Sequence, residues 1–344
     1  MSDISPSQQE WRALYAAAVE FHTLAPWEWM YDSDLFAVQN PEGGEIGYCC
    51  IMGNLGEHFA LGVYRGTEGL EGYLKIQSGE LWPPDVSLLH YQKCLMASFE
   101  DRSLLDRQDL GVIKDLGLKF RGHNVWPQFR SYLPDYHPWF VTAAEARFLT
   151  AALQQSLDIA RRFQDNPDLL APPREGLYLV RVPEGSGATL RWSDQWLPPT
   201  PLTSQQPTAP QVDELRVQRI KGSIPARQGT WEADFFLSPS PIQEHKGERP
   251  YYAYMFLWVD RRTGMVLPPQ LVSPDRYAAE FQNHFLSLNE QGGFIPQEVC
   301  VLKQEALDLL DPIAQRLGVK LRRSRRLGAL EEARNSFMGF MDQL

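Results

Sequence analysis

Apolar residues recur at helical spacing in two long segments of the first half of the chain. From Trp11 to Phe21 they lie three or four positions apart, and Ser5–Pro6 is suited to begin the helix. A second helix begins at Thr142, because Glu145 three positions later completes a capping box, and its apolar stripe continues to Phe163. These two segments are the firmest helices that the sequence predicts.

Short apolar runs separated by glycine-containing turns predict strands between these helices. We expect a β-meander over residues 35–39, 46–52 and 59–64, and further strands at 91–99 and 118–121. Helices are expected at residues 67–77 and 103–116. Gly69 and Gly72 lower the helix propensity of the first. In the second half, strands are expected at 215–220, 231–237, 251–259, 265–272, 298–302 and 319–322. One helix is expected to begin after Ser273. A second is expected over residues 305–317, with a kink at Pro312, and a third over residues 327–341.

The two halves repeat a similar order of elements. Residues 36–53 and 256–273 both indicate strand, turn and strand, and residues 100–122 resemble 304–323, where LGLKFR matches LGVKLR. The sequence therefore predicts an α+β fold with two α/β-sandwich-like domains, each with antiparallel strands leading into helix–strand–helix–strand–helix, and an internal duplication. The alternative is two unrelated α+β domains. The element order is that of the ribonuclease-H-like fold by analogy only.

Proline-rich segments indicate where the domains end. Leu197–Gln211 contains five prolines and neither charged nor aromatic residues, so it cannot bury enough surface to order itself. We expect an N-terminal domain over residues 1–165, a connecting segment over 166–211 and a C-terminal domain over 212–344.

Composition restricts the class of protein. Of 344 residues 43% are hydrophobic, yet no apolar stretch reaches the length of a membrane span, so we expect a cytoplasmic protein without membrane contact. Four cysteines without paired short spacings argue against a disulfide scaffold or a zinc ribbon, and no cofactor is expected. Adjacent Cys49 and Cys50 must point to opposite faces of a strand. The net charge of −10 makes nucleic acid an unlikely partner except locally at the basic run Lys320–Arg326.

Two stretches carry a family resemblance. GEIGYCCIMGNLGEHFALGVYRGTEGL (44–70) fits a pattern GExxYCxxMGxxGE…YxGxxGL, and residues 120–140 fit FRGxxxWPxFRxxxPxYxPW. With these motifs the chain resembles an uncharacterised bacterial family of two-domain proteins whose domains are of unknown function. The resemblance implies a bacterial, cytoplasmic origin. It does not indicate any particular activity, because none is assigned to the family.

The aromatic segment 121–139 is the strongest candidate for a site. It combines arginines that can donate to a carboxylate or phosphate, tryptophans that offer flat apolar walls, and a histidine. We expect a small anionic ligand or a partner protein to contact Arg121, His123, Trp126, Arg130 and Trp139. The turn Gly53–Glu57 would lie nearby. The alternative is an irregular segment that only pins the helix after Thr142 onto the sheet.

An enzymatic alternative rests on carboxylates. Metal-dependent nucleases of the ribonuclease-H-like type bind Mg²⁺ through acids on the first strand, after a central strand and on a late helix. Candidates at these places are Asp234, Glu305 and either Glu331 or Glu332, near Lys320–Arg326. These acids are also ordinary for helix starts and surfaces. No nucleotide, metal or nucleophile motif stands out, so the sequence favours a binding or interaction module over this metal-dependent nucleic-acid-processing enzyme.

Overall fold

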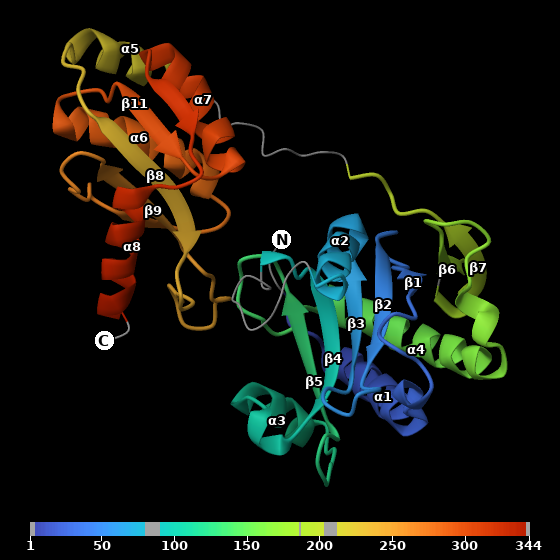
Figure 1. Ribbon diagram of the computed structural model, residues 1–344. Helices are drawn as coiled ribbons and strands as arrows, with labels where there is room; N and C mark the ends of the chain where they lie inside the picture. The colour runs from blue at the N-terminus through green and yellow to red at the C-terminus, as the bar shows by residue number, and fades with distance from the viewer. Residues whose placement is uncertain (1–3, 80–89, 186, 203–211, 342–344) are drawn as a thin grey trace. The chain divides into compact units, whose positions relative to one another are not determined.

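The computed structural model describes residues 4–79, 90–185, 187–202 and 212–341. The chain divides into two compact units, unit 1 (Met1–Thr203) and unit 2 (Ser204–Leu344) (Figure 1). Each unit has its own mixed sheet, so the predicted α+β class with two domains is confirmed.

A seven-stranded sheet forms the centre of unit 1. Its order is β5-β4-β3-β2-β1-β6-β7, and all neighbours are antiparallel except β1 and β6. The strands are β1 Phe36–Gln39, β2 Ile46–Met52, β3 Ala60–Arg65, β4 Cys94–Glu100, β5 Trp126–Tyr132, β6 Tyr178–Glu184 and β7 Arg191–Leu197. The predicted meander is present as β1, β2 and β3, and Gly53–Gly56 turns between β2 and β3.

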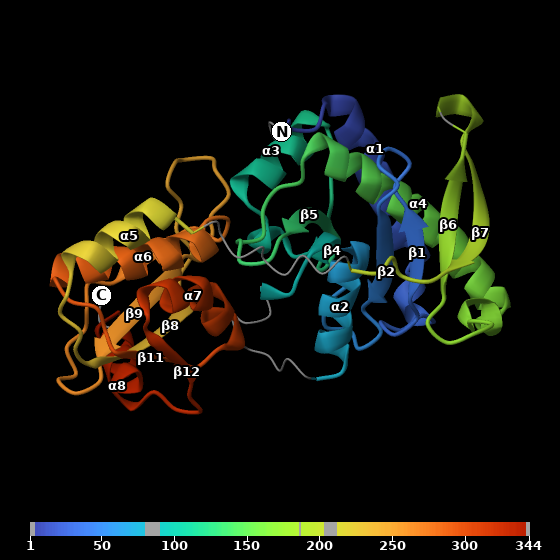
Figure 2. The same cartoon turned by 90° about the horizontal axis from the view of Figure 1, so that it is seen from above.

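Two long helices cover one face of this sheet. They are α1 Gln8–Leu24 and α4 Ala143–Asp165 (Figure 2). The helix α4 begins with the predicted capping box, whereas α1 begins two residues later than expected. It does so because the Ser7 N–H donates to the Glu10 carboxylate (2.7 Å) while the Ser7 hydroxyl accepts from the Glu10 N–H.

The opposite face packs against α2 (Gly66–Gln77) and is rich in tyrosine. Gly69 and Gly72, which lowered the predicted helix propensity, allow α2 to lie close to the backbone of residues 91–93. A Cβ atom on Gly72 would lie 2.0 Å from the carbonyl oxygen of Tyr91, and one on Gly69 would lie 2.6 Å from that of Lys93. Cys49 on β2 packs on the α1 face of the sheet.

Cys50 packs on the α2 face, which confirms that the two neighbouring thiols point apart. All four cysteines are buried and free.

The aromatic segment 121–139, for which no strand was predicted, contains the strand β5. Residues 118–121 form no strand, and β5 pairs with β4 over its whole length. The sequence did not indicate β5 because Pro127 and the polar residues of one face conceal the alternation of apolar and polar positions. Proline is tolerated here because β5 is an edge strand. The short helix before it is α3 (Arg107–Asp115).

Unit 1 also extends beyond the predicted boundary at residue 165. The strand β6 pairs in parallel with β1, and β7 pairs with β6, so much of the expected connecting segment belongs to the first sheet. Of the predicted proline-rich linker, residues 203–211 lie outside the described residues.

Unit 2 is built on a five-stranded sheet with the order β10-β9-β8-β11-β12. Its strands are β8 Thr230–Leu237, β9 Tyr254–Asp260, β10 Gln270–Val272, β11 Glu298–Val301 and β12 Lys320–Arg323. The strands β8, β9 and β10 are antiparallel, and β11 and β12 run parallel to β8. This is the strand order of the ribonuclease-H-like fold.

Helices cover both faces of the second sheet. They are α5 Glu214–Ser223, α6 Tyr277–Gly292, α7 Gln304–Leu317 and α8 Gly328–Met341. The helices α5, α6 and α7 share a core with Trp231 and Trp258, and α8 packs on the other face. The strand predicted at 215–220 is the helix α5, because Val217 and Ile220 are buried three positions apart and Asp213 caps the helix.

The two sheets do not share one order. In unit 1 the additional strands β4 and β5 continue the antiparallel meander, whereas in unit 2 the two parallel strands β11 and β12 lie on the other side of β8. The matched segments also differ, since only LGVKLR contains a strand. The predicted duplication is therefore wrong.

Candidate binding sites

The side chain of Arg130 is buried, although we expected it to be a free donor. It lies on β5 and is 7% exposed. Its guanidinium donates to both carboxylate oxygens of Asp109 (2.9 and 2.7 Å) and to Asp106 (2.7 Å). It also lies 4.6 Å from the ring centroid of Phe140. Both terminal nitrogens of the Arg130 guanidinium are thus engaged within the fold.

A cavity of about 600 Å³ lies beside β5. Arg130 and Trp139 both line it, because Trp139 forms a two-way backbone pair with Ser131 at the edge of the strand (2.8 and 3.0 Å). The other lining residues are Asp106, Arg107, Gln108, Gln128, Tyr132, His137, Pro138 and Phe140. This cavity brings together two of the five residues predicted for the site.

The other three predicted residues lie elsewhere. Trp126 is at the opposite end of β5, where its ring lies 5.6 Å from that of Phe120. The side chain of His123 is 92% exposed and contacts Asp101. Arg121 is exposed. The glycine turn after β2 does not line the cavity either, so the predicted cluster is not assembled at one place.

The acids of the enzymatic alternative have partners within unit 2. Asp234 on β8 is 5% exposed and lies 3.7 Å from the ammonium of Lys303, the N-cap residue of α7. Burial raises the pKa of Asp234, although the charge of Lys303 and a backbone hydrogen bond oppose this rise. Glu305 accepts a hydrogen bond from Tyr277.

Two acids of the same set belong to α8. Glu331 pairs with Arg326 (3.0 Å), and Glu332 is exposed. Among the residues that the structure describes, no group of three or more His, Cys, Asp or Glu could bind a metal ion.

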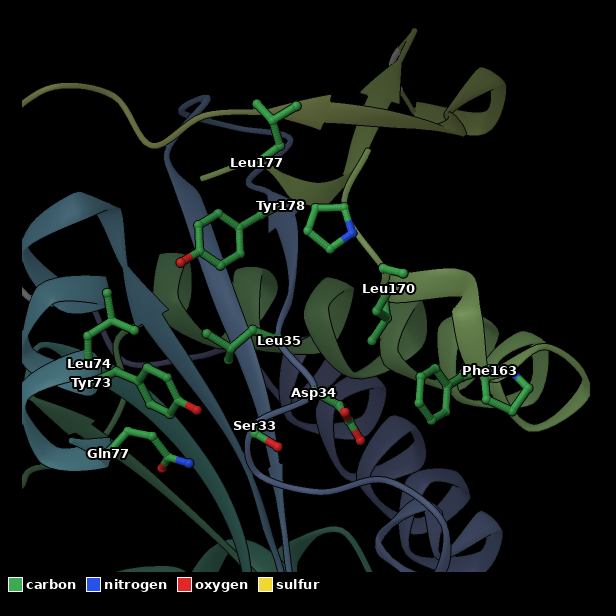
Figure 3. A pocket seen from close by; sticks show the side chains of 13 residues that line it. Ser33, Asp34, Leu35, Tyr73, Leu74, Gln77, Phe163, Leu170, Leu177 and Tyr178 are labelled. Atoms are coloured by element: carbon green, nitrogen blue, oxygen red, sulfur yellow. The ribbon is translucent and has the colours of Figure 1, made fainter. Parts of the chain in front are cut away.

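A second cavity in unit 1 was not predicted. It has a volume of about 460 Å³ and lies between α2, the segment before β1, the end of α4 and the start of β6 (Figure 3). Its walls are mainly aromatic and aliphatic, and we call it the aromatic pocket. It is lined by Ser33, Asp34, Leu35, Tyr73, Leu74, Gln77, Phe163, Pro167, Leu170, Ala171, Pro172, Leu177 and Tyr178.

The polar groups of the aromatic pocket differ in the hydrogen bonds that they form within the protein. The Tyr73 hydroxyl donates to the carbonyl oxygen of Asp32 (2.7 Å), and burial together with nearby carboxylates raises the pKa of Tyr73. Asp34 accepts a hydrogen bond from the Tyr31 N–H (2.7 Å) through one carboxylate oxygen. Within the described part of the chain, the Tyr178 hydroxyl has no hydrogen-bond partner.

Sequence reasoning missed this pocket because four separate segments build it. Its tyrosines lie on α2 and β6, far apart in the chain, and no local motif joins them. The only signal was the proline-rich start of the segment 166–211, which was predicted to connect the two domains.

Comparison with known proteins agrees with the division of the chain. Residues 11–181 match the family described as "Domain of unknown function (DUF7309)", and residues 216–338 match "Domain of unknown function (DUF6930)". Together the two matches cover most of the chain, one in each unit, and both domains are of unknown function. No curated protein matches it.

Among solved structures, a chain in "Crystal structure of the Mos1 Strand Transfer Complex" is similar to this one at 10% identity. The match covers 72% of this chain and 64% of that chain, with a TM-score of 0.19, which does not establish a common fold. No helix in the described ranges is long and apolar enough to cross a membrane.

Proposed function

We propose that this protein is a binding protein without catalytic activity, and that unit 1 binds a small molecule in the aromatic pocket. The observation that carries the proposal is the composition of that pocket. Aromatic and aliphatic walls surround a few polar groups with unused hydrogen-bonding capacity, such as the Tyr178 hydroxyl. Small-molecule sites in proteins share this composition.

The surroundings of Asp234 argue against the nuclease alternative. A divalent cation bound by Asp234 would need further oxygen ligands and would be repelled by a neighbouring ammonium. The ammonium of Lys303 lies beside the carboxylate and also donates to the carbonyl oxygen of Phe235. The positive charge of Lys303 thus balances the negative charge of the Asp234 carboxylate.

The cavity beside β5 supports a structural role for Arg130 rather than ligand binding. An anionic ligand that bound both terminal nitrogens of the guanidinium would have to displace Asp106 and Asp109. Replacing a buried, bidentate carboxylate is costly, so the aromatic pocket is the better binding site.

Native mass spectrometry of the full-length protein, combined with extraction of co-purifying compounds, tests the proposal. The variant Leu74→Trp places a large ring at the pocket wall, where Leu74 is 43% exposed. Leu104→Trp is the matched control, because Leu104 is 63% exposed and lies outside the pocket. We expect a compound that the wild type and the control retain and that Leu74→Trp loses. Equal retention by both variants would contradict the proposal.

A further inference from the structure

The described lining of the aromatic pocket carries negative charge. Among the lining residues that the structure describes, Asp34 is charged, and none is lysine, arginine or histidine. Asp32 lies close by, since its carboxylate and that of Asp34 both act on the hydroxyl of Tyr73. An anion in this pocket would be repelled, whereas a cation would be attracted.

Three aromatic rings from different elements border the same space. Tyr73 comes from α2, Phe163 from the end of α4 and Tyr178 from the start of β6 (Figure 3). The faces of such rings attract ammonium groups, and the attraction is larger where the cation is partly desolvated. Leu35 and Leu170 supply aliphatic surface for the uncharged body of a ligand.

Among the described residues, one carboxylate oxygen of Asp34 has no hydrogen-bond donor and can accept from a ligand. The backbone N–H of Tyr31 binds the other oxygen and fixes the orientation of the side chain. Asp34 is half-buried, so a hydrogen bond between it and an ammonium would be less screened than one at the surface.

The charge of the whole unit acts in the same direction. Unit 2 contains as many basic as acidic residues, so the net charge of −10 belongs to unit 1. A net negative unit raises the local concentration of cations and lowers that of anions.

We propose that the aromatic pocket binds an organic cation, an ammonium group attached to an apolar or aromatic body. This inference rests on the proposed function and specifies its ligand class. The ammonium contacts Asp34 and the aromatic rings, and the apolar body packs against the leucines of the pocket.

Three probes of similar size and different charge test the inference on the full-length protein. They are 2-phenylethylamine, 2-phenylethanol and 3-phenylpropanoate, titrated at pH 7 and followed by isothermal calorimetry or ligand-observed NMR. We expect the amine to bind about tenfold more tightly than the alcohol, and the carboxylate to bind most weakly. Tighter binding of the carboxylate than of the amine would overturn the inference.

One substitution and its control test whether the charge of Asp34, rather than the shape of the pocket, favours a cation. Asp34→Asn retains an oxygen that can accept from the Tyr31 N–H but removes the charge. We expect it to weaken binding of the amine about tenfold and to leave the alcohol unchanged. Asp168→Asn is the matched control, because Asp168 is exposed, close in sequence to Leu170 and absent from the pocket lining.

The outcomes distinguish this inference from the proposed function. Equal binding of all three probes, blocked by Leu74→Trp, would leave a binding pocket and refute its selectivity for cations. Failure of every probe, together with retention of the co-purifying compound by Leu74→Trp, would refute both.

Discussion

Arg130 shows how the same residue type can serve the fold or a ligand. From its sequence neighbours it was expected to bind an anion, yet the carboxylates that it binds belong to the start of α3. Asp109 is itself 7% exposed, so removing Arg130 would leave a buried charge without its partner. Breaking such a pair by removing one member is costly.

We therefore expect Arg130→Ala to lower the free energy of unfolding by about 3–5 kcal/mol. Arg121→Ala is the control, because Arg121 is exposed, and its effect should stay within about 0.5 kcal/mol. Urea denaturation followed by tryptophan fluorescence measures both changes. Equal effects of the two substitutions would show that the Asp109 contact contributes little.

Asp234 gives a pH-dependent prediction with a definite sign. Because burial raises its pKa in the folded protein above the unfolded value, the folded state binds the proton more tightly. Stability from this group is therefore greatest at low pH and falls as the pH rises through the folded pKa. Asp234→Asn, which cannot ionise, should raise the midpoint of thermal unfolding at pH 7.

The gain from Asp234→Asn should fade as the pH falls through about 4, the unfolded-state pKa of an aspartate, and should vanish below about 3, where the aspartate is protonated in both states. Thermal denaturation of wild type and variant across this range, with and without Mg²⁺, measures the difference. If Mg²⁺ stabilises the wild type and not the variant, Asp234 binds metal and the nuclease alternative gains support.

At the scale of elements, the sequence predicted those whose signals are local. The capping box at Thr142 and the apolar runs of β2 and β8 recur in the structure within a residue or two. The strand β5 was missed because pairing with β4, a distant segment, decides its conformation. The aromatic pocket was missed for the same reason, since its walls meet only after β6 has paired with β1.

The close packing of α2 also leads to a prediction. Gly72→Ala would place a methyl group against the backbone at Tyr91, so α2 must shift and the substitution should destabilise unit 1. Because Tyr73 is the next residue, affinity for a ligand of the aromatic pocket should fall as well.

Gly111 in α3 is the matched control, because a Cβ atom there has no neighbour within 4 Å. Gly111→Ala should stabilise the protein by about 0.5–1 kcal/mol, the difference in helix propensity. Denaturant titration of both variants checks the two signs. Stabilisation by Gly72→Ala would mean that α2 can move away from Tyr91 at little cost.

At the scale of the whole molecule, charge is divided unequally between the units. Unit 1 holds the net charge of −10, whereas the basic run Lys320–Arg326 lies in unit 2, at β12 and the residues after it. Internal carboxylates already oppose part of this run. Lys320 and Arg322 both contact Glu298 (3.2 and 3.4 Å), and Arg326 contacts Glu331 (3.0 Å).

This arrangement predicts weak binding of duplex DNA with a shallow salt dependence. Arg323 and Arg325 have no carboxylate within ion-pair distance in the described part of the chain, so about two phosphates would be neutralised. The plot of log K against log salt concentration should then have a slope of about −2. Fluorescence anisotropy of a labelled duplex measures it, and Arg325→Glu should abolish binding while Lys246→Glu, exposed elsewhere in unit 2, should have little effect. A slope steeper than about −4 would mean that Glu298 and Glu331 release their partners and that the whole basic run contacts DNA.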